Sequence, residues 1–267
     1  MLALKSTGLR QPSGVPEPQQ ELQTGLEVVD GFNRWFAVVL ADSSKLVEKA
    51  YRLRYQVYCV EHPFEDPDDN PGGLEKDAYD DHAIHSLIIH RPTNAAAGTV
   101  RLILPQPEKI ESTFPIQEFC SPEQIAAAVP GGLEKAAEIS RFAVTKQFLR
   151  RSNEVRYPDV GWTPDKQSVG TERRQHPFLM LGLLRATLMM SVDQGIEHLL
   201  AVMEPALMRL MRRFGIQFEP IGPLVEYHGT RQPCVADLSD LVRNVREHRE
   251  EFWLVGTDQG RIAEHRP

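Results

Sequence analysis

Carboxylate side chains are crowded into the segment EKDAYDD, where Glu75, Asp77, Asp80 and Asp81 lie within seven residues. Carboxylates this dense can bind a metal cation or the ammonium group of a substrate. The segment lacks the glycine and the terminal glutamate that an EF-hand calcium loop needs at fixed positions. A solvated acidic loop without a ligand explains the same composition, so these residues alone leave both interpretations open.

A second candidate group lies in KAAEISRFAV, residues 135–144, which predicts a strand. Glu138 and Arg141 are costly to bury among its apolar neighbours unless each has a partner. A functional site would explain them, and so would a structural ion pair with Arg101 of the neighbouring segment GTVRLIL. Because side chains alternate along a strand, we expect Glu138, Ser140 and Phe142 on one face and Ile139 and Arg141 on the other.

Arginines are concentrated in the polar segment 150–176 of an otherwise acidic chain. A local cationic surface of this kind could bind phosphate groups or an acidic protein partner. Scattered, solvated arginines are the alternative. The residues concerned are Arg150, Arg151, Arg156, Arg173 and Arg174.

The composition is that of a soluble globular protein and removes several function classes. The chain has 267 residues, 41% of them hydrophobic, and a formal net charge of −7, which argues against nucleic-acid binding. Its longest apolar run, 178–184, is ended by Arg185 and is too short to span a membrane. Three cysteines and the group His82, His85 and His90 lack zinc-site spacing, so we predict no metal, reduced thiols and a cytoplasmic location.

The order of predicted elements indicates an α/β (α+β) fold, a mixed central sheet flanked by helices. Residues 1–25 are rich in Pro, Gln, Gly and Ser and predict a flexible leader. Residues 26–267 predict a single domain with an arginine-rich insertion at 150–176. Strands are expected at 32–41, 84–91, 98–104, 135–144, 198–203 and 218–229, and helices at 45–61, 177–194, 205–215 and 235–253.

Four motifs in order carry a resemblance to a known family. Arg54 with Tyr58, then LEKDAYD, GTVRLIL and EISRFAV, are similar to the acyl-homoserine-lactone synthases and the related N-acyl amino acid synthases, whose fold is the GNAT-like acyl-CoA N-acyltransferase fold. The later segment EYHGTRQPC adds a resemblance to acyltransferases associated with the PEP-CTERM/exosortase system of Gram-negative bacteria. The resemblance implies transfer of a fatty acyl group, expected to be long-chain, to the amine of a small acceptor.

The resemblance also implies roles for particular residues. It places Glu138, Arg141 and Asp80 among the catalytic residues, with Glu138 as the proton acceptor. It implies that Asp77 and Asp80 orient the acceptor and its amine. The substrate-binding residues that it implies are Arg54, Tyr58, Asp77, Arg101 and Phe142.

Two departures from the family pattern guide the choice of substrates. The lactone synthases carry a tryptophan after the first helix, where this chain has CVEHPFED with Phe64, so an amino acid is the expected acceptor instead of S-adenosylmethionine. TKQFLRRS lacks the glycines that cradle a pyrophosphate, so acyl carrier protein is the expected donor, with acyl-CoA as the other thioester co-substrate and no bound cofactor. Arg150, Arg151, Arg173 and Arg174 would then bind the acidic carrier protein.

Three alternatives remain open at this point: a lactone synthase that uses S-adenosylmethionine, a CoA-dependent GNAT acetyltransferase and a non-catalytic acyl-carrier-protein binding module. For the catalytic interpretations, we expect the thioester to lie where strand 135–144 and strand 198–203 separate. A backbone N–H after Arg141 would stabilise the oxyanion. The long apolar helix is expected either to line an acyl tunnel or to pack in the core.

Overall fold

The computed structural model describes residues 18–149, 175–227 and 229–264. Its centre is an eight-stranded sheet in the order β1-β2-β3-β4-β5-β8-β6, with β7 paired to β8. The strands are β1 Phe36–Leu40, β2 Ala83–His90, β3 Ala95–Ile103, β4 Ala136–Val144, β5 His198–Met203, β6 Glu219–Pro220, β7 Val225–Glu226 and β8 Thr230–Asp237.

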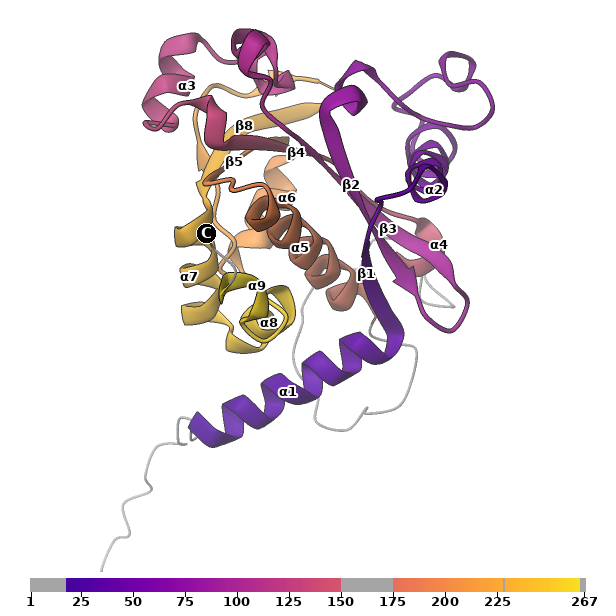
Figure 1. The fold of residues 1–267 in the computed structure, drawn as a ribbon, viewed down its shortest axis with the longest axis vertical. Helices are drawn as coiled ribbons and strands as arrows, with labels where there is room; N and C mark the ends of the chain where they lie inside the picture. Colours follow the sequence, from indigo (N-terminus) through magenta and orange to yellow (C-terminus); the bar gives the residue numbers. More distant parts are fainter. Residues whose placement is uncertain (1–17, 150–174, 228, 265–267) are drawn as a thin grey trace, which may run out of the picture.

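Helices α5 (Gln175–Asp193) and α2 (Ser44–Tyr55) cover opposite faces of this sheet (Figure 1). Helix α5 is apolar on nearly every side and packs with α1 (Pro18–Trp35) and α8 (Glu250–Gly256) in the main core. Helix α2 buries Ala50 and Leu53 against the other face.

Shorter elements complete the fold. A π-helical turn, Gln56–Glu61, continues α2, and 3₁₀ turns include η3 (Ala78–His82) and η5 (Pro115–Glu118). The other helices are α3 Pro122–Ala128, α4 Lys146–Leu149, α6 Pro205–Arg212, α7 Leu238–His248 and α9 Arg261–Glu264.

The sheet divides between β4 and β5. These strands pair in parallel from Ala136↔His198 only as far as Ile139↔Ala201, although β4 continues to Val144. On its other side β4 bulges: Thr99 pairs with Ala143 and Arg101 with Ser140, so two residues of β4 oppose one residue of β3. Such a bulge bends its strand, and here it lies where β4 leaves β5.

The predicted mixed sheet with flanking helices is confirmed, and several element boundaries are corrected. Helix α1 begins at Pro18, so residues 18–25 of the predicted leader are helical, while residues 1–17 lie outside the described residues. The first strand begins at Phe36, because Phe32 still belongs to α1 and is buried in the core. Helix α5 starts at Gln175, two residues before the predicted start at 177.

The C-terminal part departs most from expectation. The segment TRQPCVAD forms strand β8, which pairs with the whole of β5, and its last three residues had been assigned to a helix. Pro233 explains this error, because proline is depleted in strand interiors. The predicted terminal helix is two helices, α7 and α8, joined at Arg249.

Within the described ranges, no helix is long and apolar enough to cross a membrane. The three cysteines are free and buried. No group of three or more metal-ligating side chains occurs in the described part of the chain.

Candidate active site

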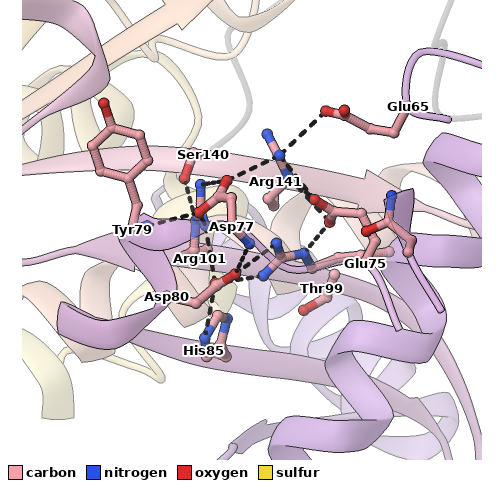
Figure 2. A network of polar contacts seen from close by, with 12 residues as sticks. Glu65, Glu75, Asp77, Tyr79, Asp80, His85, Thr99, Arg101, Ser140 and Arg141 are labelled. Atoms are coloured by element: carbon pink, nitrogen blue, oxygen red, sulfur yellow. Dashed lines mark hydrogen bonds and ion pairs between the residues drawn. The ribbon is translucent and has the colours of Figure 1, made fainter. Parts of the chain in front are cut away.

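A buried ion network joins α2, the acidic segment and two central strands (Figure 2). Arg54 of α2 is fully buried. Its Nε donates to Oε2 of Glu75 at 2.5 Å, and its two Nη atoms donate to the two carboxylate oxygens of Asp80 at 2.6 and 3.0 Å. This planar, two-pronged contact is the geometry that a guanidinium makes and an ammonium cannot.

Arg101 of β3 extends the network towards β4. Its Nη1 and Nη2 donate to the two oxygens of Asp77 at 2.5 and 3.0 Å, and Nη1 also contacts Asp80 at 2.9 Å. Its Nε donates to the hydroxyl of Ser140 at 2.8 Å. Arg101 therefore links the acidic segment to the strand that carries the proposed base.

The acidic segment is also held by its own backbone. Asp77 caps the η3 turn by accepting from the N–H of Tyr79 at 2.9 Å, and the N–H of Asp77 donates to Asp80 at 2.8 Å. The oxygens of Asp77 and Asp80 are thus engaged by arginines and backbone N–H groups. The structure supports neither of the two interpretations of the acidic segment. Asp77 and Asp80 neither form a cation site nor lie in a solvated loop, because both pair with arginines.

Arg141 lies in the bulge of β4 with a positive φ of 48°. Its guanidinium donates to Glu75 at 2.8 Å and to Asp77 at 3.0 Å, and reaches Glu65 at 3.3 Å. Arg141 therefore lies on the same side as Arg101, and the predicted alternation of Ser140 and Arg141 across the strand is wrong. The bulge is the reason, since it changes the side-chain alternation at this point. Phe142 packs against the main core and also borders the same cavity as Glu138.

The arginines keep the buried carboxylates ionised. Burial alone raises a carboxyl pKa, but Arg54, Arg101 and Arg141 outweigh it, so the pKa values of Glu75, Asp77 and Asp80 are lowered. His85 lies beside Asp80 and is neutral at physiological pH. Burial, followed by the charge of Arg54, lowers its pKa to about 4.

A cavity of about 290 Å³ opens where β4 and β5 separate. Glu138 lies on its wall with only 2% of its surface exposed. The backbone N–H of Ile116 donates to its Oε2 at 2.8 Å. Burial raises the pKa of Glu138 to about 8, against the smaller opposing effects of the Ile116 bond and Arg101. A carboxylate with such a pKa can accept a proton near neutral pH.

Comparison with known proteins agrees with this geometry. Residues 53–157 match the sequence profile of the acetyltransferase (GNAT) domain. The match covers the acidic segment, β2, β3 and β4, and so includes Arg54, Arg101, Glu138 and Arg141. No curated protein shows significant similarity to the chain.

Solved structures share the fold over most of the chain. BjaI, a CoA-dependent acyl-homoserine lactone synthase solved with MTA, has 21% identity and a TM-score of 0.52, covering 86% of this chain and 89% of its own. MesI, also a CoA-dependent acyl-homoserine lactone synthase, has 19% identity and a TM-score of 0.51, covering 80% and 95%. FeeM, an N-acyl amino acid synthase from uncultured soil microbes, has 16% identity and a TM-score of 0.51, covering 78% and 95%.

The fold brings most of the predicted site residues to one cavity. Its wall includes Tyr58, Asp77, Arg101, Glu138, Arg141 and Phe142. Phe64, expected to replace the family tryptophan, is also on this wall and is 44% exposed. Arg54 and Asp80 do not line the cavity; they lie behind it and fix Arg101 and Glu75. Arg150, Arg151, Arg173 and Arg174 lie outside the described residues.

Several residues of the site were not among the predicted site residues, although Glu75 belongs to the acidic group considered at the outset. Glu75 stands out, because it bonds both Arg54 and Arg141 and is almost fully buried. Its position two residues before Asp77, inside the same motif, was the available signal. The apolar part of the cavity was also missed, and it comes from β5, α6 and the segments around β6 and β7: Met203, Leu207, Met211, Phe218 and Tyr227.

Helix α5 packs in the main core of the protein and does not line this cavity. Of the two expectations for this helix, core packing is therefore confirmed. Leu188 and Val192 of α5 do border a separate cavity of about 320 Å³, which they share with Trp253 of α8.

Proposed function

We propose that this protein is an N-acyltransferase that moves a fatty acyl group from a thioester to the amine of an amino acid or similar small acceptor. The observation that carries the proposal is the position of Glu138. A buried carboxylate with a pKa near 8 lies on the wall of a cavity formed by two diverging strands. An amine attacks a thioester only when it is unprotonated, so a base with this pKa suits the reaction at neutral pH.

The chemical step follows from this arrangement. The acceptor nitrogen attacks the thioester carbonyl carbon and its proton passes to Glu138, directly or through a water molecule. The negative charge that develops on the carbonyl oxygen needs a hydrogen-bond donor. The backbone N–H of Phe142, which directly follows Arg141 in the bulge, is our candidate. The C–S bond then breaks, the thiolate takes up a proton, and an N-acyl product leaves.

The ion network is proposed to position the wall and not to react. Arg101 and Asp77 reach the cavity, but their charged groups are already engaged with each other. Asp80, predicted to be catalytic, is proposed to act as a positioning residue, because it binds Arg54, Arg101 and the backbone of Asp77 and lies beside His85. Tyr58 lies beneath Arg141, with the guanidinium carbon 5.5 Å from the centre of its ring.

The acyl chain is proposed to extend into the apolar part of the cavity. Met203, Leu207, Met211 and Phe218 line this part. Methionine side chains adapt their shape to flexible chains, which supports a fatty acyl group in place of an acetyl group. The donor is proposed to be acyl carrier protein, with acyl-CoA as the alternative, and the cationic segment 150–174 remains the proposed contact for the carrier. A cytoplasmic location and a link to exosortase-dependent processes remain predictions from the sequence.

The first experiment offers a panel of acyl-carrier-protein and acyl-CoA donors with pooled amino acids or S-adenosylmethionine. Thiol release is followed and the products are identified by mass spectrometry. An N-acyl amino acid is the expected product. A lactone formed from S-adenosylmethionine would assign the chain to the signal synthases. Binding of the carrier protein without thiol release from any donor would identify a binding module and contradict the proposal.

A further inference from the structure

Three arginines line the cavity, and their surroundings differ sharply. Arg101 and Arg141 each contact at least two carboxylates. Arg231 of β8 forms no ion pair within the described ranges, and the single hydrogen bond of its guanidinium goes to the backbone oxygen of Thr230 at 3.1 Å. Arg231 lines the cavity, and a guanidinium with most of its donors unused can bind an anion.

The fold holds Arg231 at this place. Gln232, the next residue, pairs with Met203 at the end of β5, on the side where β5 separates from β4. The β7–β8 hairpin is anchored by pairing of Val225 with Arg231. Tyr227, from the same hairpin, packs its ring 5.2 Å from that of Phe119. The position of Arg231 therefore follows from sheet pairing and does not depend on an ion pair of its own.

The charged side chains that line the cavity favour binding of an anion at Arg231 over other parts of the wall. The chain carries a net charge of −7, and Glu65, Asp77, Glu138 and Glu204 are the acidic residues that line the cavity. Glu65 and Asp77 bind Arg141, whereas Glu204 forms no ion pair with Arg231 in the described structure. The charges of Asp77 and Glu65 are offset by Arg101 and Arg141, so the guanidinium of Arg231 is the charge on this wall that attracts an incoming anion.

We propose that Arg231 binds the carboxylate of the acceptor, which makes the acceptor an amino acid with a free α-carboxylate or a closely similar amino acid. The inference rests on the proposed function and adds to it a residue that selects the substrate. Two contacts then orient the acceptor: its amine faces Glu138, and its carboxylate binds the guanidinium of Arg231. Esters, amides and decarboxylated amines lack the second contact and should be poor acceptors.

A binding measurement tests this inference without requiring turnover. N-Octanoyl-, N-dodecanoyl- and N-hexadecanoylglycine are titrated by calorimetry into the whole protein, alongside the corresponding glycinamides. We expect the acids to bind about tenfold tighter than the amides, a difference of about 1.4 kcal/mol. The Arg231→Gln variant should lose this difference, whereas Arg209→Gln should keep it. Arg209 is a matched control because it lies on the exposed surface of α6 and does not line the cavity.

Each outcome decides the question. If the wild type shows no preference for the acids, whether both compounds bind or neither does, the proposal is wrong. It is also wrong if the preference survives in Arg231→Gln. Steady-state kinetics then separate the acceptor from the donor: Arg231→Gln should raise KM for the amino acid, and a rise confined to KM for the thioester would instead assign Arg231 to the donor. Loss of turnover with every donor would contradict the proposed function, yet the calorimetry would still decide the role of Arg231.

Discussion

Arg141 and Glu75 are bound to each other across 66 positions of sequence, with Arg141 Nη2 2.8 Å from Glu75 Oε1. Arg141 adopts a positive φ to make this contact, a conformation uncommon for a residue with a side chain. Glu75 in turn binds Arg54 of α2. The carboxylate of Glu75 therefore connects the bulge in β4, the acidic segment and α2. These three elements determine the shape of the cavity next to Glu138.

Replacing Glu138 by Gln should lower kcat by about a hundredfold or more, since the proposed base is lost. The wild-type rate should rise with pH and level off above about 8, because Glu138 must be unprotonated to accept the proton. The rise should be absent in the residual activity of Glu138→Gln. Thiol release measured between pH 6 and pH 9.5 tests both expectations; full activity in the variant would remove Glu138 from the mechanism.

Glu138 should also make the free energy of unfolding depend on pH. Its raised pKa means that the folded protein binds a proton that the unfolded chain has lost, between the ordinary pKa near 4.5 and about 8. The contribution of Glu138 to the free energy of unfolding therefore falls as the pH rises through this window. Relative to wild type, Glu138→Gln should become progressively more stable from pH 5 to pH 8.5 in urea titrations. A difference that does not change with pH would contradict the buried-acid assignment.

The paired carboxylates should act in the opposite direction at lower pH. The pKa values of Glu75, Asp77 and Asp80 are lower in the folded protein than in the unfolded chain. Their stabilising contribution is present above the ordinary carboxyl pKa of about 4 and is lost as the pH falls below it. We expect the urea midpoint to drop steeply below pH 4, and less steeply in Asp80→Asn. Equal slopes for wild type and Asp80→Asn would argue against Asp80 as a source of the effect.

Removal of the buried charge of Arg54 should strongly lower the free energy of unfolding. Arg54→Ala would leave Glu75 and Asp80 buried without their partner, and losses of about 3–5 kcal/mol are typical of broken buried pairs. Arg52→Ala is a control on the same helix, since its contact with Glu48 is exposed and should contribute less than about 1 kcal/mol. Denaturant unfolding of both variants measures the contrast. Similar losses for the two would show that the buried network is not stabilising.

The fold class and most residues of the site could be predicted from the sequence, because the motifs GTVRLIL and EISRFAV also have the pattern of strands. The position of Arg141 could not. Its face depends on a bulge that exists only through pairing with β3, where Arg141 and Phe142 together oppose Val100. No local pattern in EISRFAV indicates an extra residue.

Long-range pairing explains the other omissions. Arg231 reaches the cavity because β8 pairs with β5, about thirty positions earlier in the chain. Pro233 weakens the strand pattern of that segment, whose first residues belong to a family motif and whose last three residues are predicted to begin a helix. For Arg54 and Asp80 the motifs indicate the correct region but not the correct position. Both are predicted to contact the substrate, whereas the structure places them behind the cavity wall.

The apolar end of the cavity should determine the acyl chain that the enzyme accepts. Met211 and Phe218 are buried and line it, so Met211→Ala should open space and shift the ratio of kcat/KM values towards longer acyl donors. One or two extra methylene groups in such a pocket change the ratio by about tenfold or more. Met190→Ala is the control, because Met190 is equally buried in α5 but does not line the cavity; both variants should lose stability. Competition between octanoyl, dodecanoyl and hexadecanoyl thioesters gives the ratios directly. An equal shift in the two variants would mean that general loosening, and not the space at Met211, controls chain length.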